Sequence, residues 1–135
     1  MEWFGNLATA LGENYQSLRQ DGKKEEKNAE IRTQILNYKH LHPQQASYIF
    51  IRVLKSDVKT IGRKMVVPPD LTWLIFVGFI RKTYKLDPSK AFFIFIQPGN
   101  QLPKIEETFQ ATYDTHGNKE TETIDIEIRL ENTFG

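Results

Sequence analysis

Residues 63–82, RKMVVPPDLTWLIFVGFIRK, constrain the fold of this chain more than any other segment. The run at 65–67 predicts a short strand, and the two prolines that follow end its pairing because proline has no backbone N–H. Thr72 then predicts the N-cap of a helix over residues 73–84, since its hydroxyl can accept a bond from an N–H of the first turn. That helix is apolar nearly all round, which is typical of burial on most sides. At about 12 residues it is too short to span a membrane, which takes about 20.

The short strand at 65–67 is expected at the edge of a sheet, and its flanks suggest two roles. Arg63 and Lys64 stand immediately before it, and the outer face of the apolar helix is expected behind it. An extended peptide can add to such an edge through backbone hydrogen bonds, and basic residues attract acidic ligands. The same charges also protect an exposed edge from aggregation. Both interpretations stay open at this point.

The composition predicts one domain without catalytic chemistry. The chain has 135 residues, and its 18 Lys and Arg residues balance 17 Asp and Glu residues, so no overall charge favours nucleic acid. The absence of Cys excludes disulfides, thiolate catalysis and Cys-ligated zinc, and His40, His42 and His116 have no partner at a recognisable spacing. Without a catalytic or phosphate-binding motif, we expect neither an enzyme nor a cofactor. The N-terminus does not resemble a signal peptide, so a cytoplasmic location is expected.

Residues 1–22 are predicted to be an amphipathic N-terminal arm. The apolar residues that fall near helical spacing are Trp3, Phe4, Leu7, Ala8 and Leu11. The arm either packs on the domain or reaches a membrane or partner, and both alternatives remain. Residues 4–7 also have an aromatic-x-x-aliphatic spacing, which is too common to be informative alone.

Residues 23–130 are predicted to form the domain, which begins with a helix over 24–41. A central strand is expected at 48–54, which is rich in aromatic and β-branched residues. The apolar run at 91–96 does not alternate, so we expect a strand covered on both faces. Strict alternation at 124–130 predicts a strand with one buried face.

A short helical turn at 105–113 completes the predicted element order: helix, helix, strand, strand, helix, strand, short helix, strand. That order predicts an α+β fold, a ubiquitin-like β-grasp with two additional N-terminal helices. The last residues, 131–135, are expected to be an exposed tail that ends in Phe134 and Gly135. A terminal Gly has no Cβ, so its carboxylate can enter a narrow active site to be adenylated, thioesterified and transferred to an amine.

Several short motifs together are similar to the autophagy-related ubiquitin-like modifiers, the group of autophagy-related protein eight, the GABA-receptor-associated protein and microtubule-associated light chain three. The motifs are KMVVPPDLT at 64–72, Phe76, IRK at 80–82, KLxPxKAxFIF at 85–95 and ENTFG at 131–135. The resemblance covers roughly residues 34–135. The sequence departs from the family pattern at His42, at Gln44 and Gln45, in the shorter basic run before the strand, and at Thr123, where the family has an aromatic residue.

The resemblance implies that E1-like and E2-like enzymes activate Gly135, with Phe134 in the recognised tail, and join it to phosphatidylethanolamine. It also implies a processing or delipidating cysteine protease, and a location in the cytoplasm and, when lipidated, on the autophagosome or vacuole membrane. Two alternatives remain. One is the twelve-type autophagy modifier, which is joined to a protein lysine and usually ends in Trp-Gly. The other is a β-grasp peptide-binding module that is never conjugated.

The resemblance further implies that receptors and adaptors dock aromatic-x-x-aliphatic motifs with acidic neighbours on the edge strand, where Arg63 adds to the basic approach. By matching positions, a pocket for the aromatic residue involves Tyr38, Ser47, Ile49, Lys64 and Val66. A pocket for the aliphatic residue involves Met65, Val67, Pro68, Leu71, Phe76, Phe79 and Ile80.

Overall fold

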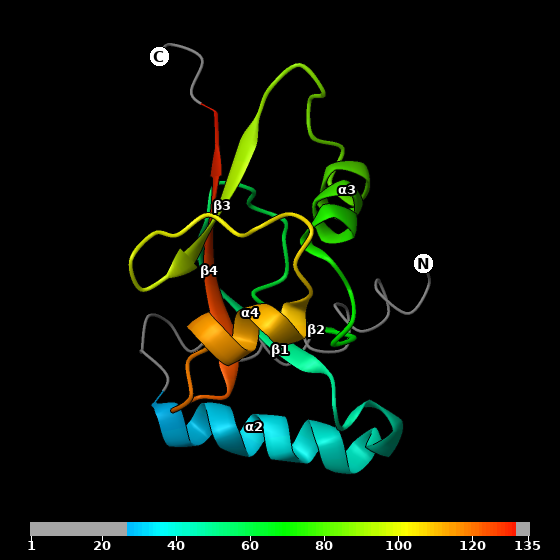
Figure 1. Ribbon diagram of the computed structural model, residues 1–135, viewed down its shortest axis with the longest axis vertical. Helices are drawn as coiled ribbons and strands as arrows, with labels where there is room; N and C mark the ends of the chain where they lie inside the picture. The colour runs from blue at the N-terminus through cyan, green and yellow to red at the C-terminus, as the bar shows by residue number, and fades with distance from the viewer. Residues whose placement is uncertain (1–26, 132–135) are drawn as a thin grey trace.

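The computed structural model describes residues 27–131, so the predicted arm, and the tail beyond Glu131, lie outside the described residues (Figure 1). The elements in chain order are α2 (Asn28–Leu41), the short 3-10 helix η1 (Pro43–Gln45), β1 (Ile49–Ser56), β2 (Lys64–Val67), α3 (Trp73–Thr83), β3 (Phe92–Gln97), α4 (Phe109–His116) and β4 (Thr123–Leu130). No helix in this part of the chain is long and apolar enough to cross a membrane.

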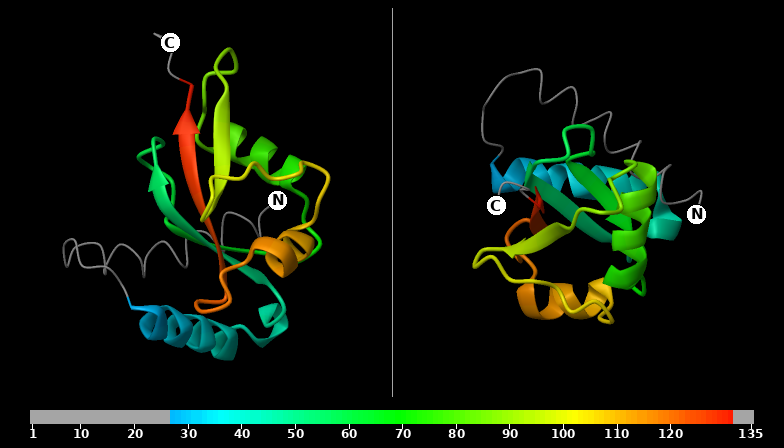
Figure 2. Two further views of the ribbon diagram at one scale, coloured as in Figure 1. Left: turned by 60° about the vertical axis from the view of Figure 1, so that its left-hand side comes forward. Right: turned by 90° about the horizontal axis from the view of Figure 1, so that it is seen from above.

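The four strands form one sheet in the order β2-β1-β4-β3. β1 pairs with β2 and β3 pairs with β4 in antiparallel fashion, and the two hairpin-like pairs meet through the parallel contact between β1 and β4. This arrangement with α3 across one face is the predicted β-grasp, so the fold class is confirmed (Figure 2). The order also confirms that β1 is central and that β2 is an edge strand.

The two faces of the sheet carry separate apolar clusters. On one face α3 buries Trp73, Phe76 and Ile80 against the strands, and these three side chains have no exposed surface. On the other face α2 packs Ile31, Ile35 and Tyr38 on Phe50 of β1 and Val66 of β2. Successive strand residues point to opposite faces, so both clusters are built from the same short strands.

Helix α3 begins where the sequence predicts. The hydroxyl of its N-cap residue Thr72 accepts a hydrogen bond from the Ile75 N–H at 3.5 Å. The indole Nε1–H of Trp73 donates to the Thr112 hydroxyl of α4 at 2.8 Å, which satisfies the polar atom of a fully buried side chain. The helix is not covered all round, because Leu74 and Ile75 in its first turn are exposed.

The structure corrects two predictions about strand burial. β3 is not covered on both faces: it lies at the edge of the sheet opposite β2, and the Phe93 side chain is exposed on the face where α2 packs only on β1 and β2. β4 does not bury one face alone, because Thr123 and Asp125 are buried beside Ile124 and Ile126. The reason is that β4 lies inside the sheet, and the Asp125 carboxylate is neutralised by Arg52 of β1.

Candidate functional site

The edge strand β2 presents its side chains alternately to the two helices. Val66 pairs with Phe50 and packs in the α2 cluster, whereas Met65 and Val67 pack in the α3 cluster. The backbone alternates as well. The Arg63 carbonyl accepts a hydrogen bond from the Val53 N–H at 2.8 Å, so the backbone groups of residues 63, 65 and 67 point toward β1. Those of Lys64 and Val66 therefore point toward the edge that no strand of the described chain occupies.

The structure brings together the residues predicted to receive an aliphatic side chain. Those buried in the α3 cluster are Met65, Val67, Leu71, Phe76 and Ile80. Phe79 is half-buried against the same cluster, and Pro68 is half-buried at the end of β2. The turn after β2 is closed by a hydrogen bond from the Leu71 N–H to the Pro68 carbonyl at 3.2 Å.

The residues predicted to receive an aromatic side chain are not brought together. Tyr38 is buried in the α2 cluster, where its hydroxyl donates to Gln45 Oε1 at 2.6 Å and its ring lies 4.3 Å from that of His42. Burial, and secondarily the neighbouring Tyr48, raises the pKa of the Tyr38 phenol. Ile49 packs on the opposite face of the sheet, in the α3 cluster. Tyr38 is thus a packed core residue and not an open pocket wall.

Ser47 and Ile49 line a different hollow of about 140 Å³ at the start of β1. Its other walls come from α2, the η1–β1 connection, β1, α4 and the α4–β4 connection: Lys39, Ala46, Tyr48, Phe50, Gln110, Tyr113 and Glu122. Lys64 is not among them. Counting positions along the sequence does not predict which face of the sheet each β1 side chain takes. That depends on the register between β1 and β2, in which Phe50, and not Ile49, stands opposite Val66.

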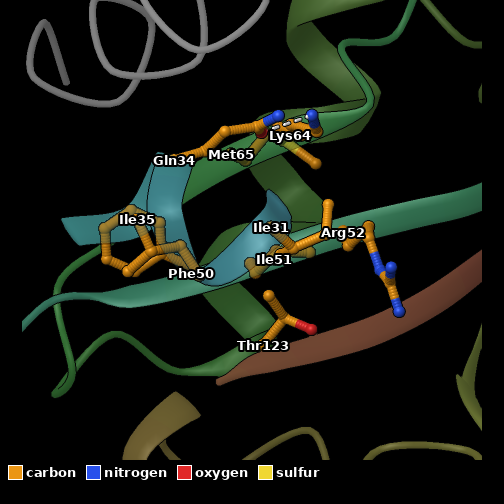
Figure 3. A pocket seen from close by; sticks show the side chains of 9 residues that line it. All are labelled: Ile31, Gln34, Ile35, Phe50, Ile51, Arg52, Lys64, Met65 and Thr123. Atoms are coloured by element: carbon orange, nitrogen blue, oxygen red, sulfur yellow. Dashed lines mark hydrogen bonds between the residues drawn. The ribbon is translucent and has the colours of Figure 1, made fainter. Parts of the chain in front are cut away.

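Lys64 instead borders a narrow cavity between α2 and the sheet (Figure 3). Its walls are Ile31, Gln34, Ile35, Phe50, Ile51, Arg52, Lys64, Met65 and Thr123. The Lys64 ammonium donates to Gln34 Oε1 at 2.7 Å across it. The cavity volume is about 20 Å³, which holds one water molecule and no aromatic ring.

Arg63 links the start of β2 to β1 through both its side chain and its backbone. Its guanidinium donates to the Leu54 carbonyl at 3.2 Å, so the side chain lies over β1. Because its backbone also pairs with β1, Arg63 extends the β1–β2 contact by one residue. The Arg63 guanidinium therefore lies beside β1 at the start of the edge strand.

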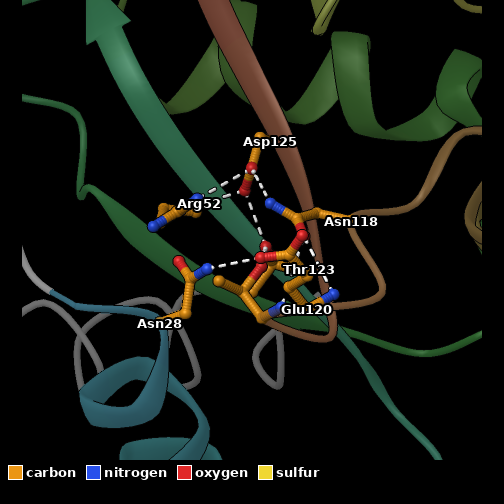
Figure 4. A network of polar contacts seen from close by, with 7 residues as sticks. Asn28, Arg52, Asn118, Glu120, Thr123 and Asp125 are labelled. Atoms are coloured by element: carbon orange, nitrogen blue, oxygen red, sulfur yellow. Dashed lines mark hydrogen bonds and ion pairs between the residues drawn. The ribbon is translucent and has the colours of Figure 1, made fainter.

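A buried polar network holds α2, β1 and β4 together, and the sequence reasoning missed it (Figure 4). Arg52 Nε and Nη2 donate to the two carboxylate oxygens of Asp125 at 3.0 and 2.8 Å. Asp125 also accepts from the Thr123 hydroxyl at 2.6 Å and from Asn118 Nδ2 at 2.9 Å. Burial alone would raise the pKa of Asp125, but these hydrogen bonds outweigh it and hold the pKa of the carboxyl below its usual value. The alternation of residues 124–130 places Asp125 on the other face of the strand from the isoleucines. Its partner Arg52 becomes apparent only from the parallel pairing of β1 and β4.

The same network reaches the helix above it. Asn28 Nδ2 donates to the Glu120 carboxylate at 2.7 Å, and Arg32 donates to the Glu120 carbonyl at 2.8 Å. These contacts fix the first turns of α2 to the connection between α4 and β4. These contacts therefore help to hold α2 over the cavity beside Lys64.

The histidines and acidic residues of the described chain form no metal centre. Among them, no group of three His, Asp or Glu side chains is placed to hold a metal ion. The imidazole of His42 contacts the Tyr38 ring in a tilted arrangement, and His116 ends α4. What residues 27–131 present is an edge strand between two helices.

Comparison with known proteins agrees with the fold and with the motifs. The family model described as "Autophagy protein Atg8 ubiquitin like" matches residues 26–135. Autophagy-related protein 8d of Arabidopsis thaliana is 40% identical over 95 residues, which are 70% of this chain and 77% of that protein. Autophagy-related protein 8 of Schizosaccharomyces pombe is 37% identical over 105 residues, 77% of this chain and 84% of that protein.

A solved structure supports the fold independently. The crystal structure of Trypanosoma brucei ATG8 is similar with a TM-score of 0.63 at 21% identity, over 82% of this chain and 94% of that one. The resemblance drawn from the sequence motifs is confirmed by these matches. This chain belongs to the Atg8 family of ubiquitin-like autophagy proteins.

Proposed function

We propose that this chain is a ubiquitin-like modifier, and not an enzyme, which is joined through Gly135 to phosphatidylethanolamine. An E1-like enzyme adenylates the Gly135 carboxylate and takes the glycine as a thioester, and an E2-like enzyme receives it by thioester exchange. The lipid amine then attacks the thioester carbonyl, so that an amide bond forms and the enzyme thiol leaves. Family membership and the terminal Phe134-Gly135 pair support this assignment.

The end of β4 suits such a tail. The Leu130 N–H donates to the Asp57 carboxylate, and the Glu131 N–H donates to the Ala91 carbonyl, at 2.9 and 2.8 Å. The Glu131 carboxylate in turn accepts from the Ala91 N–H at 2.8 Å. These bonds tie the domain down as far as Glu131. Four more residues in extended form can reach roughly 13 Å beyond the domain. That reach is consistent with residues 131–135 as a conjugation tail that follows a domain at 23–130.

We infer the remaining parts of the conjugation cycle from family membership. A cysteine protease would process the chain or release it from the lipid. The protein would be cytoplasmic before conjugation and bound to the autophagosome or vacuole membrane afterwards. Autophagy homologues support this cycle in general terms.

We further propose that receptors and adaptors dock aromatic-x-x-aliphatic motifs on the open edge of β2. The observation that carries this proposal is the alternation of β2 between two helices. In an added strand, residues three apart point to opposite faces and lie about 10 Å apart along the strand. An aromatic residue and an aliphatic residue at that spacing would therefore face α2 and α3 respectively. The outward backbone groups of Lys64 and Val66 would supply the hydrogen bonds.

The two sides of this dock are unequal. On the α3 side, the predicted residues already form one apolar cluster. On the α2 side, the cavity of about 20 Å³ would have to widen before it admitted a ring, and the bond between Lys64 and Gln34 would have to break. We therefore expect the aliphatic residue of a motif to contribute more of the binding free energy than the aromatic one.

Lipidation in a purified system tests the modifier proposal. The chain is incubated with cognate E1-like and E2-like enzymes, ATP and liposomes that contain phosphatidylethanolamine. A faster-migrating band should appear with the chain and be absent with Gly135→Ala. A band that persists in Gly135→Ala would overturn conjugation through this residue. If a conjugate forms only on a protein lysine, without liposomes, the twelve-type alternative holds, and no conjugate of any kind favours the unconjugated peptide-binding module.

A further inference from the structure

The residues of the edge strand β2 are more deeply buried than those of an edge strand usually are. Met65, Val66 and Val67 have no exposed surface. Packing against α2 and α3 explains why the side chains are buried. It does not explain the burial of the backbone N–H and C=O of Val66, which point toward the edge away from β1. No strand of residues 27–131 lies on that side.

Buried backbone groups need hydrogen-bond partners. More than nine in ten buried N–H and C=O groups in proteins are paired, because an orphan costs about as much as a lost hydrogen bond. Among the backbone hydrogen bonds of residues 27–131 that lie outside helices and sheet ladders, none involves Val66. The covered edge is therefore a place where another extended segment fits.

The chain itself contains a segment with the chemistry of the proposed ligand. Residues 2–7 read Glu-Trp-Phe-Gly-Asn-Leu, in which Phe4 and Leu7 have the aromatic-x-x-aliphatic spacing and Glu2 is the acidic neighbour. We propose that this N-terminal segment occupies the edge of β2 in cis and competes with receptor motifs. The inference rests on the proposed docking function and names its first ligand.

The pairing follows from the alternation of β2. Phe4 would face α2 beside Val66, and Leu7 would face the α3 cluster beside Met65 and Val67. The carboxylate of Glu2 would lie toward the basic approach at Arg63 and Lys64. Gly5, between the two anchors, has no side chain, so the backbone can approach the strand closely there.

The connection is long enough. Twenty residue steps separate Leu7 from Lys27, which can span up to roughly 65 Å when extended. Gln34, which bonds to Lys64, stands seven residues beyond Lys27 along α2 and therefore only about 10 Å away along the helix axis. The closure is not strained.

Tethering sets the size of the effect. A flexible linker of this kind gives an effective concentration on the order of 1 mM. If the segment alone bound with a Kd of about 100 µM, it would weaken a competing peptide about tenfold. The same occupancy would shield the strand edge from aggregation, so the two roles considered for β2 would follow from one contact.

Binding measurements on full-length proteins test this inference. A short acidic peptide with a Trp-x-x-Leu core is titrated by calorimetry into the wild type, into Phe4→Ala/Leu7→Ala and into the control Leu11→Ala, which alters the arm outside the motif. The double variant should bind about tenfold more tightly than the wild type, and the control should match the wild type. Equal affinities for all three would overturn the cis contact. If Leu11→Ala tightens binding as much as the double variant, the arm packs as a helix and strand addition is wrong.

Two further measurements separate the inference from the proposed function. Lys64→Ala should weaken the peptide in the double-variant background. If the peptide binds none of these proteins, the docking function fails, and hydrogen exchange then decides the cis contact. The Val66 amide should exchange slowly in the wild type and faster in the double variant, and unchanged exchange refutes the contact. If protection appears only at high protein concentration together with a dimer on size-exclusion chromatography, the segment binds a second copy instead.

Discussion

The buried ion pair between Arg52 and Asp125 gives the sharpest prediction about stability. Asp125→Asn keeps the shape of the side chain and removes its charge. Arg52 donates to both carboxylate oxygens, so either orientation of the new amide turns its NH2 group toward an Arg52 donor. Removing one partner of a buried pair costs about 3–5 kcal/mol. We expect the lower end, about 3 kcal/mol, because 19% of the Arg52 side chain remains exposed against 6% for Asp125.

The pH dependence has a defined sign. The folded-state pKa of Asp125 lies below its ordinary value, so the carboxylate stabilises the fold above the unfolded-state pKa of about 3.9. That contribution is lost as the pH falls through the folded-state pKa. The difference in unfolding free energy between the wild type and Asp125→Asn should therefore be constant between about pH 5 and 7 and shrink below about pH 4.

Urea denaturation followed by circular dichroism measures this difference, with Glu127→Gln as the matched control. Glu127 pairs with Arg129 on the same strand at 2.9 Å, but that pair is more exposed, so its loss should cost less than about 1 kcal/mol. If Asp125→Asn costs no more than Glu127→Gln, or if its cost is the same at pH 3 and pH 7, the assigned role of the network is wrong.

Three further predictions concern α3 and the edge strand. Thr72→Ala removes the N-cap and should lower the unfolding free energy by about 0.5–1 kcal/mol in urea denaturation, since the bond to Ile75 is long. Trp73→Phe leaves the buried Thr112 hydroxyl without its donor and opens space in the core, so it should cost about 2 kcal/mol, and a neutral result would contradict the packing described. Lys64→Ala should weaken an acidic motif peptide several-fold at low salt and less at high salt, and an affinity independent of salt would remove Lys64 from the dock.

The local elements could be predicted from the sequence because their signals are local. The two prolines after residue 67 end β2, and Thr72 starts α3, as the structure confirms. The burial of β3 could not be predicted this way. A run such as FFIFI reads alike at the centre and at the edge of a sheet, and only its pairing with β4 places Phe93 on an uncovered face.

The candidate site could likewise be predicted only where its residues are close together in sequence. The residues proposed for the aliphatic side of the dock are close together in sequence, and in the structure they cluster around α3. The aromatic side depends on how α2, β1 and β2 meet. Neighbouring residues on β1 point to opposite faces of the sheet: Ile49 faces α3 and Phe50 faces α2. No local sequence pattern specifies which of the two faces which helix. Arg52 and Asp125 lie far apart in the chain, so their contact appears only when β1 and β4 pair.

The edge of β2 is proposed here as the dock for aromatic-x-x-aliphatic motifs. A two-dimensional 1H–15N NMR titration of the labelled chain with an acidic motif peptide locates the binding surface residue by residue. We expect the largest shifts on the amides of Lys64 and Val66 and on Phe79 of α3. Shifts that gather on the free edge of β3 and leave Lys64 and Val66 unchanged would contradict it.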